Sequence, residues 1–239
     1  MKAYAIVMSN NQNSLEGYRT LHKSIDDTHS KITLLPFEAT QPHTIGEGLK
    51  EVFSTRPSWT WPSTPQEDRL CLRTGLQKRH YQAVDQNRVI ACAVSHYRLW
   101  NICAKGDEPI VILEHDARFI RQFSIEQLAG RWGAVGLNDP RGNTRKGIKF
   151  HQLVEACGEG VHRVPVIDEP TDPPLPMGLA GNSAYIIKPD FAKGLLDEVR
   201  NVGIWPNDAI MCRQLFPSLK VVYPYFTDVV KRGSTTTGI

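Results

Sequence analysis

The chain has 239 residues, of which 41% are hydrophobic, and this is enough for one α/β domain with a continuous buried core. Its 28 basic and 25 acidic residues nearly balance, which excludes the strong positive field of a dedicated non-specific nucleic-acid binder. The sequence has no apolar stretch approaching the roughly 18 to 20 residues of a membrane span, and residues 1–8 are too short for a signal peptide. We therefore expect a soluble, cytoplasmic protein.

The five cysteines are scattered along the chain and include no Cys-x-x-Cys pair, so their spacing predicts neither a zinc clamp nor a redox pair. Cys92 lies one helical turn before His96, which would suit a catalytic cysteine, but positions four apart simply share a helix face. We interpret the cysteines as buried thiols.

The first part of the chain predicts a strand, a helix and a second strand. Residues 3–8 form an apolar run that ends in the polar segment 9–11, as in a buried strand that opens into a loop. Apolar residues three to four apart in 15–25 predict an amphipathic helix, and residues 32–37 predict a strand. Such alternation predicts parallel strands, and ligands gather at the carboxyl ends of strands in such sheets.

The region 46–86 is expected to be a loop-rich insertion. Three prolines and two tryptophans between residues 54 and 65 prevent a helix or a central strand there. Trp59 and Trp61 would be able to stack on a sugar or a base, but we favour the interpretation that both rings cover the edge of the core.

Residues 87–103 predict a long, largely buried helix that leads to the apolar strand 110–113. Glu114, His115 and Asp116 follow this strand directly. In an extended segment residues i and i+2 point the same way, so Glu114 and Asp116 would face one divalent ion, whereas His115 would point away. The spacing alone is weak evidence, because acidic residues after a buried strand are usually solvated.

The rest of the chain continues the alternation of strands and helices. Strands are predicted at 134–137, 182–187 and 221–224, and helices at 189–199 and 209–216. Between them lies a basic run, Arg141, Arg145, Lys146 and Lys149, which suits either a loop that closes over a diphosphate or a merely solvated loop.

Several ordered motifs carry a resemblance to a known family. Residues 91–100 (ACAVSHYRLW) and 112–117 (ILEHDA) resemble the helix and acidic signature of glycosyltransferase family 25, which includes lipooligosaccharide and collagen galactosyltransferases. Residues 181–187 (GNSAYII) and 205–208 (WPND) are similar to its Gly-Thr-x-Gly-Tyr-Ile-Ile and Pro-x-Asp elements. His115 replaces the first Asp of the family's Leu-Glu-Asp-Asp.

The resemblance implies a GT-A-like α/β fold, a single domain over residues 1–239 with a mainly parallel central sheet flanked by helices. It also implies a nucleotide-sugar donor, most often a UDP-sugar, and Mn²⁺ or Mg²⁺, with inversion at the anomeric carbon. The metal would lie on Asp116, with Glu114 supporting the ion or the nucleotide. Because imidazole favours softer ions than magnesium, the His115 replacement makes manganese the first metal to test.

The remaining site residues follow from the same resemblance. Donor contacts are expected from His96, Arg98, Asn182 and Ser183, although a histidine in a buried helix is more often a hydrogen-bonded structural group. An inverting transfer needs one general base, and Asp208 is the candidate. The alternative role of Asp208 is an N-terminal cap of the helix that follows it.

Several acceptors and two other function classes stay open. A saccharide of a surface glycoconjugate is favoured as the hydroxyl acceptor, and hydroxymethylated pyrimidines in DNA or hydroxylysine are alternatives. The chain would otherwise be a degenerate, non-catalytic nucleotide- or glycan-binding module, for which the altered acidic motif argues, or a nucleotide hydrolase.

Overall fold

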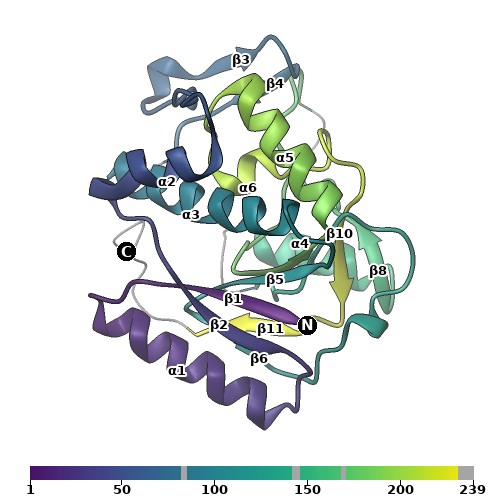
Figure 1. Cartoon of the computed structure of the whole chain (residues 1–239). Helices are drawn as coiled ribbons and strands as arrows, with labels where there is room; N and C mark the ends of the chain where they lie inside the picture. The colour runs from purple at the N-terminus through teal and green to yellow at the C-terminus, as the bar shows by residue number, and fades with distance from the viewer. Residues whose placement is uncertain (82–84, 142–145, 168–170, 231–239) are drawn as a thin grey trace.

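The computed structural model describes residues 1–81, 85–141, 146–167 and 171–230, and a seven-stranded sheet lies at its centre (Figure 1). The strand order is β2-β1-β5-β9-β7-β10-β8. The bounds are β1 (Lys2–Val7), β2 (Thr33–Glu38), β5 (Ile110–Glu114), β7 (Ala134–Gly136), β8 (Gly160–Arg163), β9 (Ala184–Ile187) and β10 (Leu219–Tyr223).

Most strands of this sheet run in one direction. β1 pairs in parallel with both β2 and β5, and β7 pairs in parallel with β10. β9 is antiparallel to both β5 and β7, and β8 is antiparallel to β10, so β1, β2, β5, β7 and β10 share a direction. The prediction of an α/β fold with a mainly parallel central sheet is confirmed.

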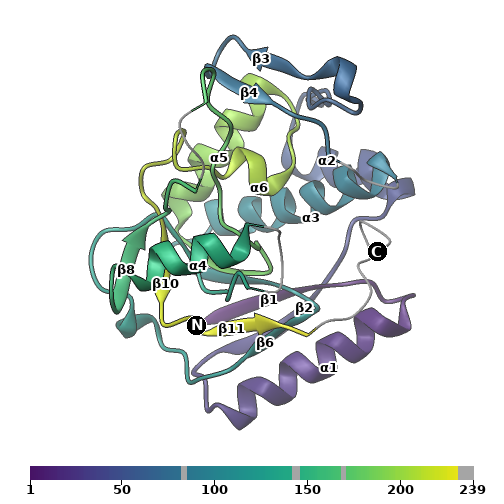
Figure 2. The ribbon, with the colours of Figure 1, turned by 180° about the vertical axis from the view of Figure 1, so that it is seen from behind.

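Helices cover both faces of the sheet. Figures 1 and 2 show α1 (Gln12–Asp27) on one side, and α2 (Ile45–Val52), α3 (Gln86–Ala104) and α5 (Pro189–Val202) on the other. The pair β6 (Ala117–Phe119) and β11 (Thr227–Val229) lies beside α1. The smaller elements are α4 (Gly147–Glu155), α6 (Asn207–Ile210), the hairpin β3 (Arg69–Cys71) with β4 (Leu76–Lys78), and the 3₁₀ turns η1 (Pro42–Thr44), η2 (Pro65–Glu67) and η3 (Ile125–Gln127).

The continuous apolar run of β5 follows from burial on both of its faces. Because side chains alternate along a strand, Ile110 and Ile112 join the hydrophobic cluster on the side of α3 and α5, which includes Trp100. Val111 and Leu113 join the cluster on the side of α1. The same alternation turns the next residue of β5, Glu114, toward α3.

Most of the strongly periodic segments form as predicted. The strand, helix and strand at the N-terminus are β1, α1 and β2, and the predicted helix 87–103 is α3. The interpretation that both tryptophan rings cover the core also holds. Trp61 is buried and packs edge-on against Trp205, with 5.1 Å between the ring centroids, and Trp59 is partly buried against the same core. No helix within the described residues is both long and apolar enough to cross a bilayer.

The helix predicted at 209–216 is wrong in extent, because α6 ends at Ile210. The backbone leaves the helical conformation at Met211 (φ −79°, ψ 68°). Beyond this point the N–H of Arg213 donates to the carbonyl of Met177 at 2.9 Å, and Cys212 forms a bridge with Gly178. The neighbouring loop satisfies backbone groups that a longer helix would have paired internally.

Candidate active site

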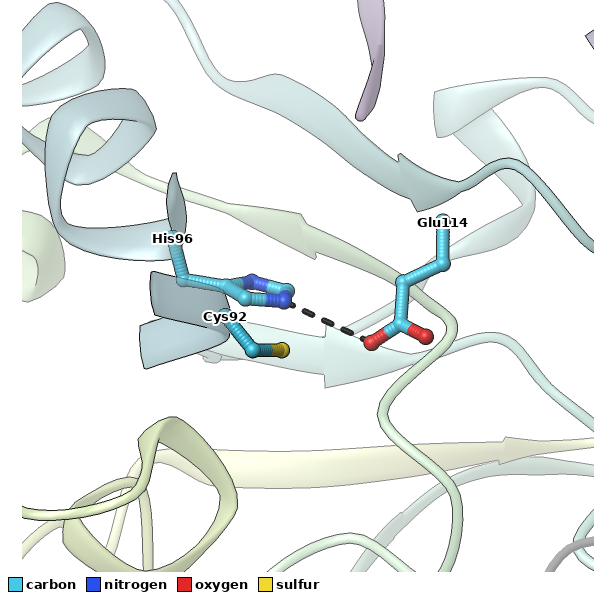
Figure 3. Close-up of side chains that lie close together, drawn as sticks. All are labelled: Cys92, His96 and Glu114. Atoms are coloured by element: carbon cyan, nitrogen blue, oxygen red, sulfur yellow. Dashed lines mark ion pairs between the residues drawn. The ribbon is translucent and has the colours of Figure 1, made fainter. Parts of the chain in front are cut away.

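The candidate site lies where β5 ends. Glu114 closes this strand, and its side chain faces His96 on α3, with 3.5 Å between Glu114 Oε1 and His96 Nε2 (Figure 3). That distance is an electrostatic contact and is too long for a normal hydrogen bond. Because β1, β2 and β5 are parallel, the loops that follow Val7 and Glu38 open at the same edge of the sheet.

His96 is held by a buried hydrogen-bond network. The ring is fully buried, and its Nδ1 lies 2.8 Å from the hydroxyl oxygen of Tyr185, which also accepts a hydrogen bond from Trp100 Nε1 at 2.7 Å. An indole N–H only donates, so the Tyr185 hydroxyl oxygen accepts from Trp100, and its second partner is His96 Nδ1. The other ring nitrogen, Nε2, faces Glu114.

The environment of Glu114 keeps its carboxylate ionised. Burial alone would raise its pKa, but contact with His96 and the charge of the nearby His115 lower the pKa below its ordinary value. Its backbone N–H donates to the carbonyl of Ser183 at 2.7 Å, which ties the end of β5 to the segment before β9.

Asp116 lies in the turn between β5 and β6 rather than on an extended strand. The expectation that Glu114 and Asp116 share a face through strand alternation is therefore wrong at this position. Asp116 Oδ1 is buried and has no hydrogen-bond partner among the described residues. Burial and the charge of Glu114 raise the pKa of Asp116 to about 7. Among the described residues, no positive charge contributes to the pKa of Asp116 and offsets its burial.

Asp208 approaches the same region from α6. The N-cap of α6 is Pro206, so the capping role considered for Asp208 is not what the structure shows. Asp208 instead accepts a hydrogen bond from the Tyr81 hydroxyl at 2.9 Å. Burial raises the pKa of Asp208, the Tyr81 hydrogen bond opposes this, and the charge of Glu114 adds to the increase.

Asn182 and Ser183 stand beside Glu114 because β9 pairs with β5 in the register Leu113↔Ala184. Asn182 is buried, and within the described part of the chain neither its side-chain oxygen nor its side-chain nitrogen has a hydrogen-bond partner. Unpaired buried amide groups are costly, so this side chain has unused capacity to bind a ligand.

The described contacts of Arg98 are with α2 and the end of β2, not with Glu114 or Asp116. Its guanidinium donates to Glu51 at 2.7 Å and to the carbonyl of Glu38 at 3.0 Å, and it stacks on Phe37 at 4.7 Å. These contacts join α3 to α2 and to the end of β2. Of the basic run, Arg141 pairs with Asp139 at 2.6 Å, and Arg145 lies outside the described residues.

Cys92 joins the site, which the sequence analysis did not predict. One ligand atom each from Cys92, His96 and Glu114 lie within 4.8 Å of one another (Figure 3). Burial, and then the charges of Glu114 and Asp208, raise the pKa of the Cys92 thiol. A neutral thiol is a poor nucleophile, so the geometry does not favour a catalytic cysteine. The available signal was the four-residue spacing from His96.

Residues 73–129 match the family model described as glycosyltransferase family 25 (LPS biosynthesis protein). Over this segment the chain is similar to family 25 glycosyltransferases. The segment covers about a quarter of the chain and contains α3, β5 and the acidic turn, and hence Cys92, His96, Glu114 and Asp116. No curated protein matches the chain significantly.

Solved glycosyltransferase structures show a distant likeness to this chain. The galactosyltransferase LgtC, solved with donor and acceptor sugar analogues, is 13% identical with a TM-score of 0.39, and the alignment covers 92% of this chain and 73% of LgtC. GlyE of Streptococcus pneumoniae TIGR4 is 7% identical with a TM-score of 0.39, over 93% of this chain and 44% of GlyE. Mouse xyloside xylosyltransferase 1 is 9% identical with a TM-score of 0.41, over 91% of this chain and 82% of the mouse protein.

Proposed function

We propose that this glycosyltransferase is a single domain over residues 1–239 that moves a hexose or related sugar from a UDP-sugar to a hydroxyl of a surface saccharide. The reaction is metal-dependent and inverts the anomeric carbon. The observation that carries the proposal is the unpaired, buried carboxylate of Asp116 next to Glu114, on the segment that matches the family. The lipopolysaccharide connection of the family description supports the saccharide acceptor.

A divalent cation fits the residues at this edge of the sheet. Asp116 offers a buried oxygen without a partner in the described ranges, and a cation there would offset the burial and the Glu114 charge that raise its pKa. Asp116 would hold the ion and Glu114 would support the ion or the nucleotide, with manganese as the first choice. When bound, the ion supplies positive charge that stabilises the departing diphosphate.

Asn182 and Ser183 contact the donor in this proposal. The Asn182 amide is adjacent to the end of β5 and keeps both of its polar atoms unused by the described residues. A nucleotide or sugar hydroxyl would satisfy them. His96 orients Glu114 from the side of α3 and does not touch the donor, because its ring is fully buried and hydrogen-bonded to Tyr185.

Asp208 is the proposed general base. Its carboxylate is held by Tyr81 and lies close enough to Glu114 for the two charges to interact. A raised pKa strengthens a carboxylate as a base, which suits removal of a proton from an acceptor hydroxyl. DNA is the less favoured acceptor, because the two tryptophans that would stack on a base are buried (Trp61) or partly buried (Trp59) in the core.

The test is the stereochemistry of the product. The protein is incubated with Mn²⁺, a panel of UDP-sugars and simple saccharides, and NMR follows both UDP release and the new glycosidic bond. The proposal expects an inverted linkage, lost in Asp208→Asn and kept in Asp197→Asn, a control on an exposed aspartate of α5. A retained configuration would exclude Asp208 as the in-line base. Nucleotide binding without turnover for any donor would favour the non-catalytic module.

A further inference from the structure

The side chains of Cys92, His96 and Glu114 form a ligand set that the proposed transfer reaction does not use as a unit. Two come from one face of α3 and the third from the end of β5, and their ligand atoms lie within 4.8 Å of one another (Figure 3). His96 Nε2 is fully buried, faces Glu114, and has no hydrogen-bond partner among the residues that the structure describes.

The spacing suits a small tetrahedral ion. Zinc bonds of about 2.0 to 2.3 Å place neighbouring ligand atoms roughly 3.3 to 3.8 Å apart. The 3.5 Å between His96 Nε2 and Glu114 Oε1 already falls in this range. The Cys92 sulfur would have to approach by about 1 Å. Its thiol now donates a long hydrogen bond of 3.9 Å to Asn207 Oδ1, which ion binding would replace.

The chemistry of the ligands selects the kind of ion. A thiolate, an imidazole and a carboxylate together favour zinc and similar borderline ions over magnesium or manganese, which prefer oxygen. The charges of Glu114, Asp208 and Asp116 all reach Cys92 and create a negative potential there. That potential disfavours a free thiolate, but it attracts a cation, and a bound cation stabilises the thiolate.

A hydrogen bond with Tyr185 already orients the His96 ring. Histidine ligands of metals almost always hydrogen-bond through the other ring nitrogen, and His96 Nδ1 does so with Tyr185 at 2.8 Å. On binding, Nε2 offers its lone pair to the ion, and a proton on Nδ1 is donated to the Tyr185 oxygen. Cys92 loses its thiol proton to solvent. The site is reachable, because the Glu114 side chain is 32% exposed.

We propose that Cys92, His96 and Glu114 form a second cation site, selective for zinc-type divalent ions and separate from the position at Asp116. An ion in this site binds Glu114 and thereby withdraws it from the donor, so zinc inhibits sugar transfer. Only the inhibition rests on the proposed function. Binding itself is independent of any activity.

Cobalt(II) tests the binding, since a cobalt–thiolate bond gives a near-ultraviolet charge-transfer absorption. Titration of the whole chain with Co²⁺ alone should produce this band at one equivalent. The band should disappear in Cys92→Ser and remain in Cys157→Ser, a matched change of an exposed cysteine. It should also remain in Asp116→Ala, and Tyr185→Phe should weaken binding about 10- to 100-fold.

Absence of the thiolate band in the folded protein, or its persistence in Cys92→Ser, would overturn the site. Zinc inhibition is then measured at constant manganese, with each protein compared with its own zinc-free rate. The wild type should lose more activity than Cys92→Ser, and equal losses would overturn the inhibitory role. If no transfer is detectable at all, the proposed function fails while the cobalt result still decides the site.

Discussion

Gly17 allows α1 to pack directly against the acidic turn, and this contact gives the sharpest test of how the site is positioned. The glycine is buried, and a Cβ built on it would lie 2.4 Å from the carbonyl oxygen of His115. The carbonyl carbon and the imidazole Cδ2 of the same histidine would each lie 3.1 Å away. Gly17→Ala therefore forces α1 and the turn apart.

The size of the effect follows from this geometry. Ordinary contact begins near 3.4 Å, so the helix and the turn must separate by about 1 Å. Overpacking of this kind costs about 1 to 3 kcal/mol, and replacing a helical glycine by alanine returns about 1 kcal/mol. The free energy of unfolding should fall by only about 0 to 2 kcal/mol. A 1 Å displacement of binding groups costs up to roughly 100-fold in rate.

Urea unfolding and the rate of sugar transfer measure the two effects separately. Gly194→Ala is the matched control, because this helical glycine on α5 has its nearest neighbour, Phe216 Cε1, at an ordinary 3.5 Å. The control should gain up to about 1 kcal/mol and keep its activity. If Gly17→Ala were as active as Gly194→Ala, the proposal that this contact positions Glu114 and Asp116 would be refuted.

Three further predictions concern single side chains. Asp208→Asn should fold and bind nucleotide but lose about 10²- to 10⁴-fold in kcat, and a normal kcat would remove it as the base. Tyr185→Phe leaves the buried N–H of Trp100 without its acceptor and should lower the free energy of unfolding by about 1 to 3 kcal/mol in urea; an unchanged midpoint would contradict the network. Burial would raise the pKa of Asp139, but hydrogen bonds and the charge of Arg141 lower it. Its ionised form therefore adds stability that is lost as pH falls through the lowered pKa. Arg141→Ala should be less stable than the wild type near neutral pH, and this difference should shrink in thermal unfolding as the pH is lowered through the pKa of Asp139; a difference that does not change with pH would exclude this pair.

The parts of the fold that could be predicted are those where burial imposes a repeating pattern. The apolar run 110–113 is buried on both faces, and the helix 87–103 packs along most of its length, so both patterns are strong. The strands β3, β4, β6 and β11 have three residues each, which is too few for a period to show. α6 stops early because the loop at Met177 and Gly178 takes its backbone partners, and this is a long-range event.

The site, too, could be predicted only in part from the sequence. Glu114 and His96 could be singled out from the sequence, but their contact arises from the packing of α3 over β5. Strand alternation does not apply to Asp116, because the chain turns directly after Glu114. The partners of Arg98 depend on α2, a helix that the sequence analysis did not predict.

The central claim is that Asp116 holds a divalent ion that the nucleotide donor requires. Calorimetric titration of the protein with nucleoside diphosphates and UDP-sugars, with and without Mn²⁺, tests it most directly, with Asp197→Ala as the control for Asp116→Ala. We predict manganese-dependent binding of one nucleotide that is lost in Asp116→Ala and kept in Asp197→Ala. Binding that is independent of manganese, or unchanged in Asp116→Ala, would contradict the account.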